Sequence, residues 1–565
     1  LSSGQMKGIG PKIAEKIYAA YGNESLEVLD KEPDKLLTIS GISEGKLKKI
    51  KESYLASRGA RDVVAFLAPH GISPNRAVKL YLKYGEQTMD IVRNHPYKLC
   101  EMAGVGFRTA DKIAMSMGFD KLSPERVDEG LLYTLAEAEL KGHLCMEKHA
   151  FIQQGLKILD TEGLTEEMAA NRAAYLVHIE RLAVYRNRVY RSAAARAEQR
   201  LAERIYNLQN TARPHHYGNL SADITALEKK LRLTLNEEQK AAVATAMTSP
   251  ITVVTGGPGT GKTLIQRAFL ELYRSKNPSG KITCCAPTGR AARRMEESTG
   301  IPATTIHKAL GLIAGDDGIY CEPEQLEADL VLVDEVSMMD VYLAGHLLYS
   351  IPQGCQLVLI GDVDQLPSVG PGAVLKSLIA CGKIPVVRLE KIYRQSFGSR
   401  IATNAKLIRS GNLGMEYGDD FQLFESSDLS ESADLLEELY LQETGHYGVD
   451  NVALLTPFRQ KTETGVNALN SRLQSKVNPP AAGKPELSHG KRIFRLGDKV
   501  MQIKNFEDVN NGDVGYITGI IRDGDASYVT VDFGDGRTME YESSDLEMLD
   551  HAYASTVHKS QGSEY

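Results

Sequence analysis

The stretch GGPGTGKT, Gly256 to Thr263, constrains the fold of this chain more than any other segment. It follows the apolar run Ile251 to Val254 and precedes LIQRAFLELY, which has the composition of a helix. A strand, a glycine-rich loop and a Lys-Thr pair that opens a helix together form a cradle of backbone N–H groups for a polyphosphate. We therefore expect the nucleotide to contact Gly257, Pro258, Gly259, Thr260, Gly261, Lys262 and Thr263.

Two side chains of this loop have specific roles in nucleotide binding. Lys262 can reach the β- and γ-phosphates, and the hydroxyl of Thr263 can bind Mg²⁺. The sequence therefore predicts a site for ATP or GTP together with Mg²⁺.

Length and composition limit the remaining possibilities. A chain of 565 residues is too long for one core, so we expect about three to five domains. The seven cysteines form no CxxC pair, which argues against a zinc site and favours free thiols in a reducing cytoplasm. The net charge of −7 argues against a protein that binds polyanions over its whole surface, but it allows a locally basic channel for nucleic acid. No apolar run is long enough to span a bilayer, so we expect a cytoplasmic protein without a membrane partner.

Glycine-led turns recur in residues 1–120, each before a short amphipathic helix. The pattern resembles tandem helix–hairpin–helix motifs, whose turn N–H groups bind DNA phosphates without reading sequence. A purely structural helical repeat is the alternative. The four turns begin at Gly8, Gly41, Gly71 and Gly104, and the first and last keep a second glycine, Gly10 and Gly106.

The predicted secondary structure changes twice in the rest of the chain. Residues 121–220 favour helices, with a short hairpin from Leu182 to Tyr190 as in a winged-helix-like module. Beyond them, apolar runs alternate with helical patterns, which is typical of a doubly wound α/β core. The turn signal Asp317-Gly318 predicts a β-hairpin within residues 311–327, and residues 485–548 have the short alternating strands of a small β-barrel. The expected α/β strands are residues 251–255, 281–286, 330–333, 356–360, 386–389 and 452–455.

Two of these expected strands end in polar side chains. LVLVDEVSM places Asp334 and Glu335 at the carboxyl end of a strand, where ligands bind in open α/β sheets. Asp334 would hold the hydration shell of Mg²⁺, and Glu335 would orient or deprotonate the attacking water. Gln365 follows the next apolar run, and its amide can bond both a γ-phosphate oxygen and water, although a capped turn is the alternative.

Further segments resemble, in the same order, the motifs of superfamily 1 helicases. They are APTGRAARRM at 286–295, ATTIHKALG at 303–311, LEKIYRQ at 389–395, LTPFRQKTETGVNALN at 455–470 and AYASTVHKSQGSEY at 552–565. Over residues 230–565 the chain is most similar to the RecD-like helicases, particularly the long stand-alone kind. The resemblance implies a multidomain fold with two RecA-like α/β motor domains of the P-loop NTPase class, an all-α N-terminal helix–hairpin–helix region and a small SH3-like β-barrel insertion.

This resemblance also implies domain boundaries. Residues 1–120 would hold the tandem repeats, and residues 121–220 the helical, winged-helix-like module. Residues 221–385 would form the first motor domain with a hairpin pin at 311–327, and 386–565 the second, with its barrel at 485–548. The sequence ends inside motif V without a counterpart of the motif VI arginine, so we expect a truncated second motor domain.

Roles for single residues follow from the same resemblance. Gln239 resembles the adenine-reading glutamine, Arg394 the motif IV arginine that stabilises charge on the transferring phosphate, and Glu564 a nucleotide contact. A surface glutamine is the alternative for Gln239. Single-stranded DNA would be held by short hydroxyls and helix-start amides, some of which are only helix caps. The candidates are Thr288, Arg290, Thr305, His307, Thr556, His558 and Lys559, with Gly8, Gly10, Gly104 and Gly106 in the repeats.

The resemblance thus implies an ATP-dependent, monomeric motor that translocates 5′→3′ on single-stranded DNA. It would unwind tailed or forked duplexes in repair or recombination, near the bacterial nucleoid and without a nuclease partner. An ATP-switched DNA-binding scaffold and an RNA helicase of the same superfamily are the alternatives. Unwinding of tailed duplexes, and the preference for DNA or RNA in stimulated ATP hydrolysis, discriminate among the three.

Overall fold

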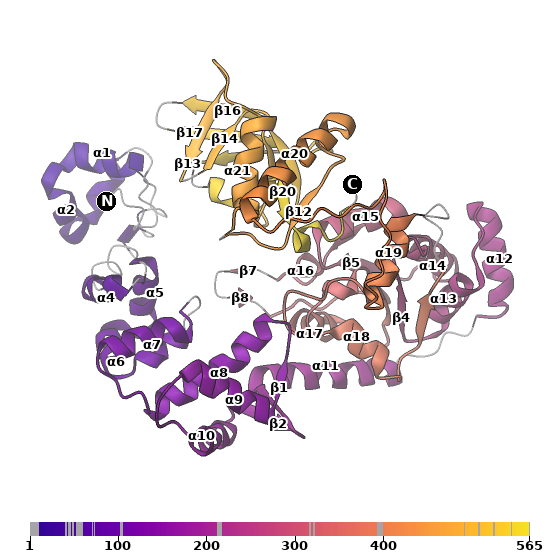
Figure 1. Cartoon of the computed structure of the whole chain (residues 1–565), viewed down its shortest axis with the longest axis horizontal. Coiled ribbons are helices and arrows are strands. Elements are labelled where there is room, and N and C mark those ends of the chain that lie inside the picture. Colours follow the sequence, from indigo (N-terminus) through magenta and orange to yellow (C-terminus); the bar gives the residue numbers. More distant parts are fainter. Residues whose placement is uncertain are drawn as a thin grey trace. The chain divides into compact units, whose positions relative to one another are not determined.

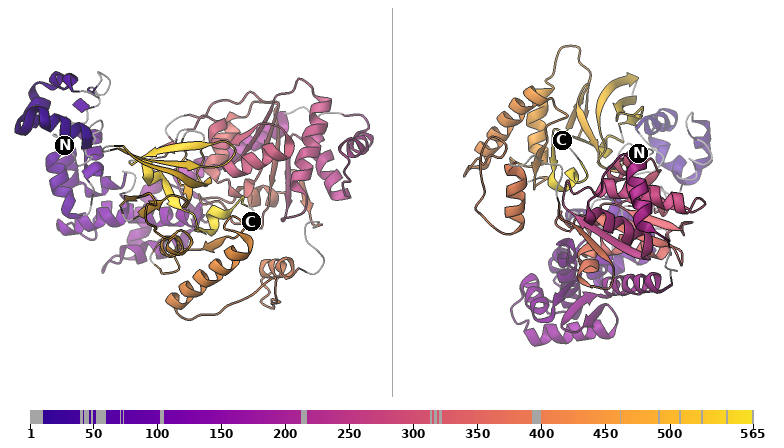
Figure 2. Two further views of the ribbon diagram at one scale, coloured as in Figure 1. Left: turned by 90° about the horizontal axis from the view of Figure 1, so that it is seen from above. Right: turned by 90° about the vertical axis from the view of Figure 1, so that its right-hand side faces the viewer.

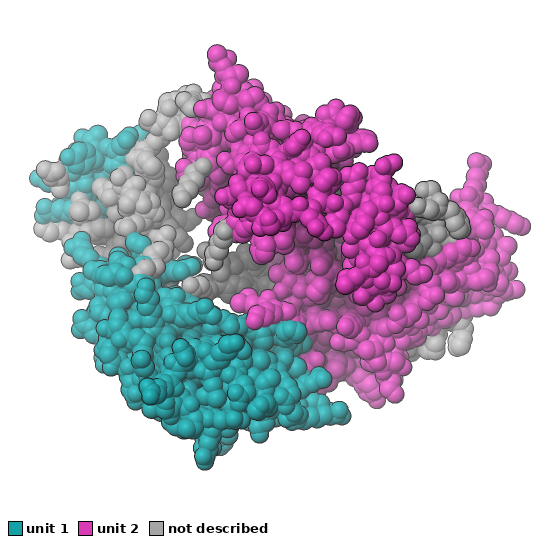
Figure 3. Space-filling view, viewed as in Figure 1, with its two compact units in different colours: residues 1–139, 143–195, 314–319 teal, residues 140–142, 196–313, 320–565 magenta. Residues whose placement is uncertain are grey.

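The computed structural model comprises two compact units (Figure 3), which are residues 1–139, 143–195 and 314–319, and residues 140–142, 196–313 and 320–565. Among the described residues, no helix combines the length and apolar character needed to cross a bilayer. The structure describes residues 11–39, 42, 47, 50–51, 60–70, 72, 74–101, 105–211, 217–312, 314–315, 318–319, 322–391, 399–460, 462–490, 492–506, 509–523, 526–543 and 545–563.

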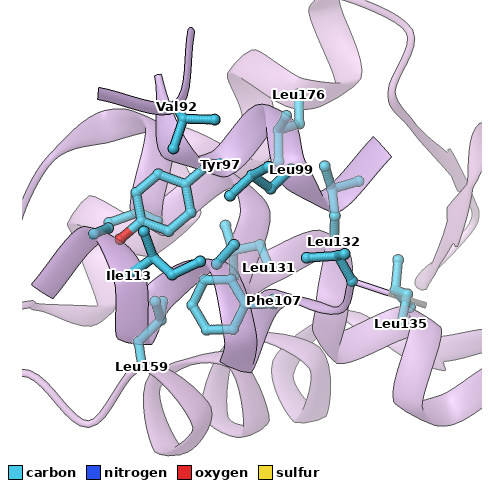
Figure 4. Close-up of a cluster of buried hydrophobic side chains, with 14 of the residues drawn as sticks. Val92, Tyr97, Leu99, Phe107, Ile113, Leu131, Leu132, Leu135, Leu159 and Leu176 are labelled. Carbon is cyan, nitrogen blue, oxygen red and sulfur yellow. The ribbon is translucent and has the colours of Figure 1, made fainter. Parts of the chain in front are cut away.

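The first unit consists mainly of short helices with apolar residues at helical spacing. On α7, for example, Ala110, Ile113 and Ala114 are buried. Figure 4 shows Tyr97 and Phe107 in the core that the helices between residues 61 and 178 share, whereas the two helices before residue 32 contribute to a separate core. The helices are α1 (Pro11–Tyr21), α2 (Ser25–Lys31), α4 (Arg61–Leu67), α5 (Pro74–Tyr84), α6 (Thr88–Asn94), α7 (Phe107–Ser116), α8 (Pro124–Leu140), α9 (Lys148–Leu159) and α10 (Glu166–His178).

The hairpin expected near residue 185 is present as β2 (Leu182–Tyr185) and β3 (Arg188–Arg191). A third strand, β1 (Cys145–Glu147), pairs antiparallel with β3 and was not expected, because three residues are too few to show a strand period. A second small hairpin, β7 (Ala314–Gly315) with β8 (Gly318–Ile319), lies within the predicted 311–327 segment.

The second unit contains a parallel sheet of six strands in the order β11-β4-β10-β9-β5-β6. Five of the strands follow the apolar runs of the sequence, because the central strands of a parallel sheet are buried on both faces. The sixth, β6, is the half-buried segment Ala-Thr-Thr, which lacks that signal. The strands are β4 (Ile251–Gly256), β5 (Ile282–Ala286), β6 (Ala303–Thr305), β9 (Leu330–Val333), β10 (Gln356–Gly361) and β11 (Val386–Leu389).

Helices connect and flank these strands (Figure 1). The amphipathic faces of α13 and α14 bury Val243 and Phe269 in one cluster with strand residues such as Val254 and Leu332. The helices are α11 (Ser192–Thr211), α12 (Leu220–Leu231), α13 (Glu237–Thr248), α14 (Lys262–Lys276), α15 (Gly289–Thr299), α16 (Ile306–Ala309), α17 (Val341–Ser350) and α18 (Val374–Ala380).

The remaining part of the second unit begins a further α/β layer and then inserts a β-rich body, drawn in orange and yellow in Figure 2. Here β12 (Leu454–Thr456) pairs parallel with β20 (Ala554–Thr556), and between them lie α21 (Val466–Val477) and the insertion. The insertion has an antiparallel sheet in the order β18-β17-β16-β15-β19 and the hairpin β13-β14. The other bounds are α19 (Arg400–Arg409), α20 (Leu429–Tyr447), β13 (Glu486–His489), β14 (Arg492–Arg495), β15 (Lys499–Gln502), β16 (Val514–Asp523), β17 (Ala526–Asp532), β18 (Thr538–Glu542) and β19 (Leu549–His551).

Candidate functional site

The glycine-rich loop joins the end of β4 to the first residue of α14. Gly259 and Gly261 have φ angles of 75° and 91°, which residues with a side chain rarely adopt. At Gly256 a Cβ atom would lie 2.7 Å from Thr260 Oγ1 and 2.8 Å from Leu389 Cβ, so no side chain fits there. The Thr260 hydroxyl donates to the Gly257 carbonyl at 2.8 Å. The sequence thus folds here into a tight loop whose backbone can approach a ligand closely.

The first helical residue after the loop is Lys262, and its ammonium group lies over that loop. Lys262 Nζ donates to the carbonyl oxygens of Gly256 at 2.6 Å and Gly257 at 3.1 Å. Thr263 follows and is exposed at the start of α14. A cation, a hydroxyl and the N-terminus of a helix therefore meet at one place, which favours the binding of an anion such as a phosphate.

Asp334 and Glu335 lie directly after β9, at the carboxyl edge of the sheet. Burial raises the pKa of the Asp334 carboxyl, while the Gln266 amide, the Glu335 N–H and Lys262 lower it. Asp334 Oδ1 accepts the Glu335 N–H at 2.9 Å. Glu335 has a φ of 51°, an uncommon backbone conformation for a residue with a long side chain. The turn therefore holds both carboxyl groups in place.

Glu335 has the electrostatic character of a general base. Its Oε2 is buried and has no hydrogen-bond partner within the described residues. Burial, together with the charges of Asp334 and Asp362, raises the pKa of Glu335 to about 7, although Lys262 opposes this shift. A carboxyl group with a pKa near neutrality can take a proton from water and release it again at physiological pH.

Asp362 is a site residue that we did not select from the sequence. It follows β10 as Asp334 follows β9, and that shared position after a fully apolar strand was the signal that could have identified it. The side chain is 3 % exposed, and burial raises its pKa. Asp362 Oδ1 accepts the Asp364 N–H at 3.0 Å. Because β10 lies between β4 and β9, Asp362 belongs to the same edge of the sheet as the loop and Glu335.

Gln365 lies three residues after Asp362 and faces the turn that follows Glu335. Its Oε1 accepts the Ser337 hydroxyl at 3.4 Å, and its backbone N–H donates to the Asp362 carbonyl at 3.2 Å. The structure therefore places Gln365 beside the acidic turn, and its role as a γ-phosphate sensor stays a prediction.

Gln239 is 2 % exposed, and both polar atoms of its side chain bond to the protein. Its Oε1 accepts the Asn236 N–H at 3.0 Å in a capping box at the start of α13, and its Nε2 donates to the Thr260 carbonyl at 3.1 Å. A Cβ atom on Gly261 would lie 2.5 Å from that Nε2. Gln239 thus connects α13 to the glycine-rich loop, and its contact with adenine stays a prediction.

All three threonines predicted to contact DNA are helix N-caps. The hydroxyls of Thr288, Thr305 and Thr556 accept N–H groups at the starts of α15, α16 and the short helix Val557–Ser560. Capping explains these threonines structurally, and it also places each of them at a helix N-terminus where a phosphate could bind.

The other DNA candidates lie near these caps. Arg290 donates to the Ser563 hydroxyl, and Lys559 Nζ donates to Asn511 Oδ1 at 3.3 Å. Burial lowers the pKa of both Lys559 and His307, and His558 is exposed. A groove of about 540 Å³ brings Thr305 and His307 together. Its lining also includes Gly289, Arg293, Lys308, Asn505 and Asn510.

Of the repeat glycines, Gly106 precedes α7 in an extended conformation. The predictions for Gly8, Gly10, Gly104, Arg394 and Glu564 lie outside the described residues.

Comparison with protein families assigns most of the chain. Residues 56–145 match the helix–hairpin–helix domain of the ATP-dependent RecD2 DNA helicases, and residues 469–533 match the SH3 domain of the ATP-dependent RecD-like DNA helicases. Residues 234–427 match an AAA domain, and residues 4–53 match a SAM-like helix–hairpin–helix tandem.

Comparison with individual proteins extends this result. The ATP-dependent RecD2 DNA helicase of Deinococcus radiodurans is 32 % identical over 570 residues, which cover 99 % of this chain and 77 % of the relative. The RecBCD enzyme subunit RecD of Mycolicibacterium smegmatis is 36 % identical over 31 % of this chain and 36 % of its own length. Among solved structures, the Pif1 helicase of Candida albicans is 20 % identical with a TM-score of 0.34, over 58 % of this chain and 86 % of that chain.

Sequence similarity along nearly the whole chain and the matches to both family-specific domains agree with the geometry, in which a glycine-rich loop and buried carboxyl groups share one edge of a parallel sheet. The chain therefore belongs to the ATP-dependent RecD2 DNA helicases and is an ATP-hydrolysing DNA helicase.

Proposed function

We propose that Mg²⁺·ATP binds at the carboxyl edge of the parallel sheet, with Lys262 on the β- and γ-phosphates. Thr263 and Asp334 would hold the Mg²⁺ ion and its water shell, since a hydroxyl and a carboxylate are oxygen ligands that this ion accepts. The bound ion would neutralise charge on the phosphates. The donor set supports this assignment, because the Lys262 ammonium opposes the rise that burial causes in the pKa of the Asp334 and Asp362 carboxyls.

The environment of Glu335 is the main support for the proposed mechanism of ATP hydrolysis. Its buried, unpartnered Oε2 and its pKa of about 7 suit a group that receives the proton of the attacking water. Gln365 would orient the water and the γ-phosphate from the neighbouring turn. Arg394 would reach the same phosphate from the second motor domain and stabilise its charge as the bond breaks.

We further propose that hydrolysis drives 5′→3′ movement along single-stranded DNA by a monomeric motor. Caps at Thr288, Thr305 and Thr556 would release and rebind successive phosphates. The β7–β8 hairpin would act as the pin that separates a tailed or forked duplex. We also propose that this motor acts in DNA repair or recombination, in the bacterial cytoplasm at the nucleoid and without a nuclease partner.

Unwinding of tailed duplexes tests this proposal. We expect a duplex with a 5′ tail to be separated in the presence of Mg²⁺·ATP, whereas one with a 3′ tail is not. Lys262→Ala should abolish the reaction. Faster separation of the 3′-tailed duplex would reverse the polarity. ATP-dependent DNA affinity without strand separation would favour a switched scaffold, and stronger stimulation of ATP hydrolysis by RNA would favour an RNA helicase.

A further inference from the structure

The tip of the β2–β3 hairpin is an exposed surface of the first compact unit that takes no part in the mechanism proposed above. The hairpin belongs to the sheet β1-β3-β2, so β2 is an edge strand within the described residues. All five residues from Val184 to Arg188 are exposed, and Tyr185 is 64 % exposed. Since these side chains pack against little of the protein, the fold does not require their particular chemistry.

The turn of the hairpin holds an arginine where a glycine is usual. Arg186 has a φ of 54°, and a positive φ at the first position of a two-residue turn favours glycine. The turn is nevertheless fixed, because the Asn187 carbonyl accepts the Lys148 N–H at 2.9 Å and the Asn187 amide donates to Glu147. Arg186 Cζ lies 5.4 Å from the centroid of the Tyr185 ring. The turn therefore presents a cation against an aromatic side chain.

Three cations at this tip have no carboxylate partner. Lys148, Arg186 and Arg188 are exposed, and none of them forms an ion pair in the described part of the chain. Glu147 is in register with Arg188, but its carboxylate is engaged as the N-cap of α9. Arginines of the neighbouring segments are paired instead, as Arg172 with Asp128, Arg181 with Glu129 and Arg191 with Glu139. The tip therefore has a surplus of positive charge, which attracts a phosphate backbone.

We propose that this hairpin tip binds the sugar–phosphate backbone of duplex DNA without reading its sequence. Arginine, lysine and tyrosine side chains are common donors to phosphate oxygens. The grooves of a duplex accommodate a two-stranded β-ribbon or an inserted arginine, whereas single strands are bound in basic grooves with stacking platforms. An exposed tip with one aromatic side chain fits the duplex. The proposal involves none of the residues assigned above to ATP or to single-stranded DNA.

Binding of a fluorescent blunt duplex to the whole protein, without nucleotide and over a series of salt concentrations, tests the proposal. Each lost phosphate contact should reduce the slope of log K against log salt by about 0.9. We expect a decrease of about this size for Arg186→Gly and about twice this size for Arg186→Gly/Arg188→Gln. Arg186→Lys keeps the charge and should keep the parental slope. Lys121→Gln is the matched control, because Lys121 is an exposed cation of the same unit outside the hairpin.

Four outcomes would overturn the proposal. Glycine suits the φ of Arg186, so a Tm of Arg186→Gly well below that of the parent would identify the arginine as a structural residue of the turn. A parental slope in both hairpin variants would show that the tip does not bind the duplex. An equal loss of slope with single-stranded poly-dT would assign the tip to single strands. If duplex binding is unchanged but the variants lose a polyglutamate peptide that the parent binds, the tip is a surface for an acidic protein.

Discussion

The reactivity of the site depends most on one side chain, Glu335. With a pKa of about 7 it is largely protonated, and inactive as a base, at acidic pH. We expect kcat/KM for DNA-stimulated ATP hydrolysis to fall below about pH 7, and Glu335→Gln to remove this acid limb and slow hydrolysis by roughly 10²- to 10⁴-fold. Rates measured across the neutral range check this. An acid limb that survives in Glu335→Gln would assign the titration to another group.

The same carboxyl should affect stability. Its folded pKa of about 7 exceeds its ordinary value of 4.5, so the folded chain binds this proton more tightly than the unfolded chain does. The resulting stabilisation is complete below pH 4.5 and is lost as pH rises through 7. Glu335→Gln, which stays neutral, should therefore be more stable than the parent at alkaline pH by about 1–3 kcal/mol and nearly equal to it at acidic pH. Urea unfolding of both proteins at two pH values measures the difference, and equal stability at alkaline pH would contradict it.

At the scale of elements, Gln239 connects the start of α13 to the glycine-rich loop that we propose binds the nucleotide. Gly261→Ala would strain a φ of 91° and place Cβ 2.5 Å from Gln239 Nε2. We expect the loop to shift and nucleotide affinity to fall at least about tenfold, a loss of about 1.4 kcal/mol. Gly345→Ala on α17 is the control, since nothing lies within 4 Å of its added Cβ. Unchanged affinity of Gly261→Ala in an equilibrium titration would show that the loop tolerates the displacement.

Hydrogen bonds of one buried aspartate connect the β-rich insertion to α21 and to the segment that precedes β20. Asp498 is 0 % exposed and accepts hydrogen bonds from Gln474 and Asn478 of α21 at 2.6 Å and from the Tyr553 hydroxyl at 3.0 Å. In Asp498→Asn some of these donors would face an NH₂ group and lose their acceptor. This should lower the free energy of unfolding by about 2–4 kcal/mol. We expect Asp498→Asn to lower the Tm, whereas Asp535→Asn, a change at an exposed residue, should leave the Tm unchanged. Equal Tm values for the two variants would show that Asp498 is dispensable.

At the scale of the whole molecule, the nucleotide site and the N-terminal helical repeats belong to different compact units. We expect Lys262→Ala to abolish ATP hydrolysis and unwinding but to keep the affinity for a tailed duplex within about threefold, because phosphate contacts elsewhere dominate that affinity. Lys262 contacts only loop carbonyls in the hydrogen bonds of the described chain, so folding should be intact. Fluorescence anisotropy measures the affinity, and Lys281→Ala, which removes an exposed ion pair with Glu327, is the control. A variant that hydrolyses ATP normally would refute the role of Lys262.

Much of the architecture was predictable because it depends on local patterns. The buried strands β4, β9 and β10 are visible in the sequence as apolar runs. The helicase family was predicted from motifs in their order along the chain, and a relative that is 32 % identical over 99 % of the chain confirms it. The short strands β1 and β6 were missed, since their pairing partners and not their own residues make them strands. The proposed domain boundaries, and the roles of Arg394 and Glu564, stay predictions.

By itself the sequence determined the phosphate loop, the strand that carries Asp334 and the repeat region, because glycine spacing and hydrophobic period act over a few residues. Only the tertiary structure decided that Asp362 lies at the same sheet edge as Asp334 and that the Gln239 side chain bonds to the glycine-rich loop. Parallel pairing brings β4, β10 and β9 side by side from distant parts of the chain, and burial at their shared edge then sets which carboxyl groups hold protons. No short segment of the sequence determines the distance between two of these carboxyl groups or the dielectric around them. The ionisation of the site is therefore set only when the strands pack together.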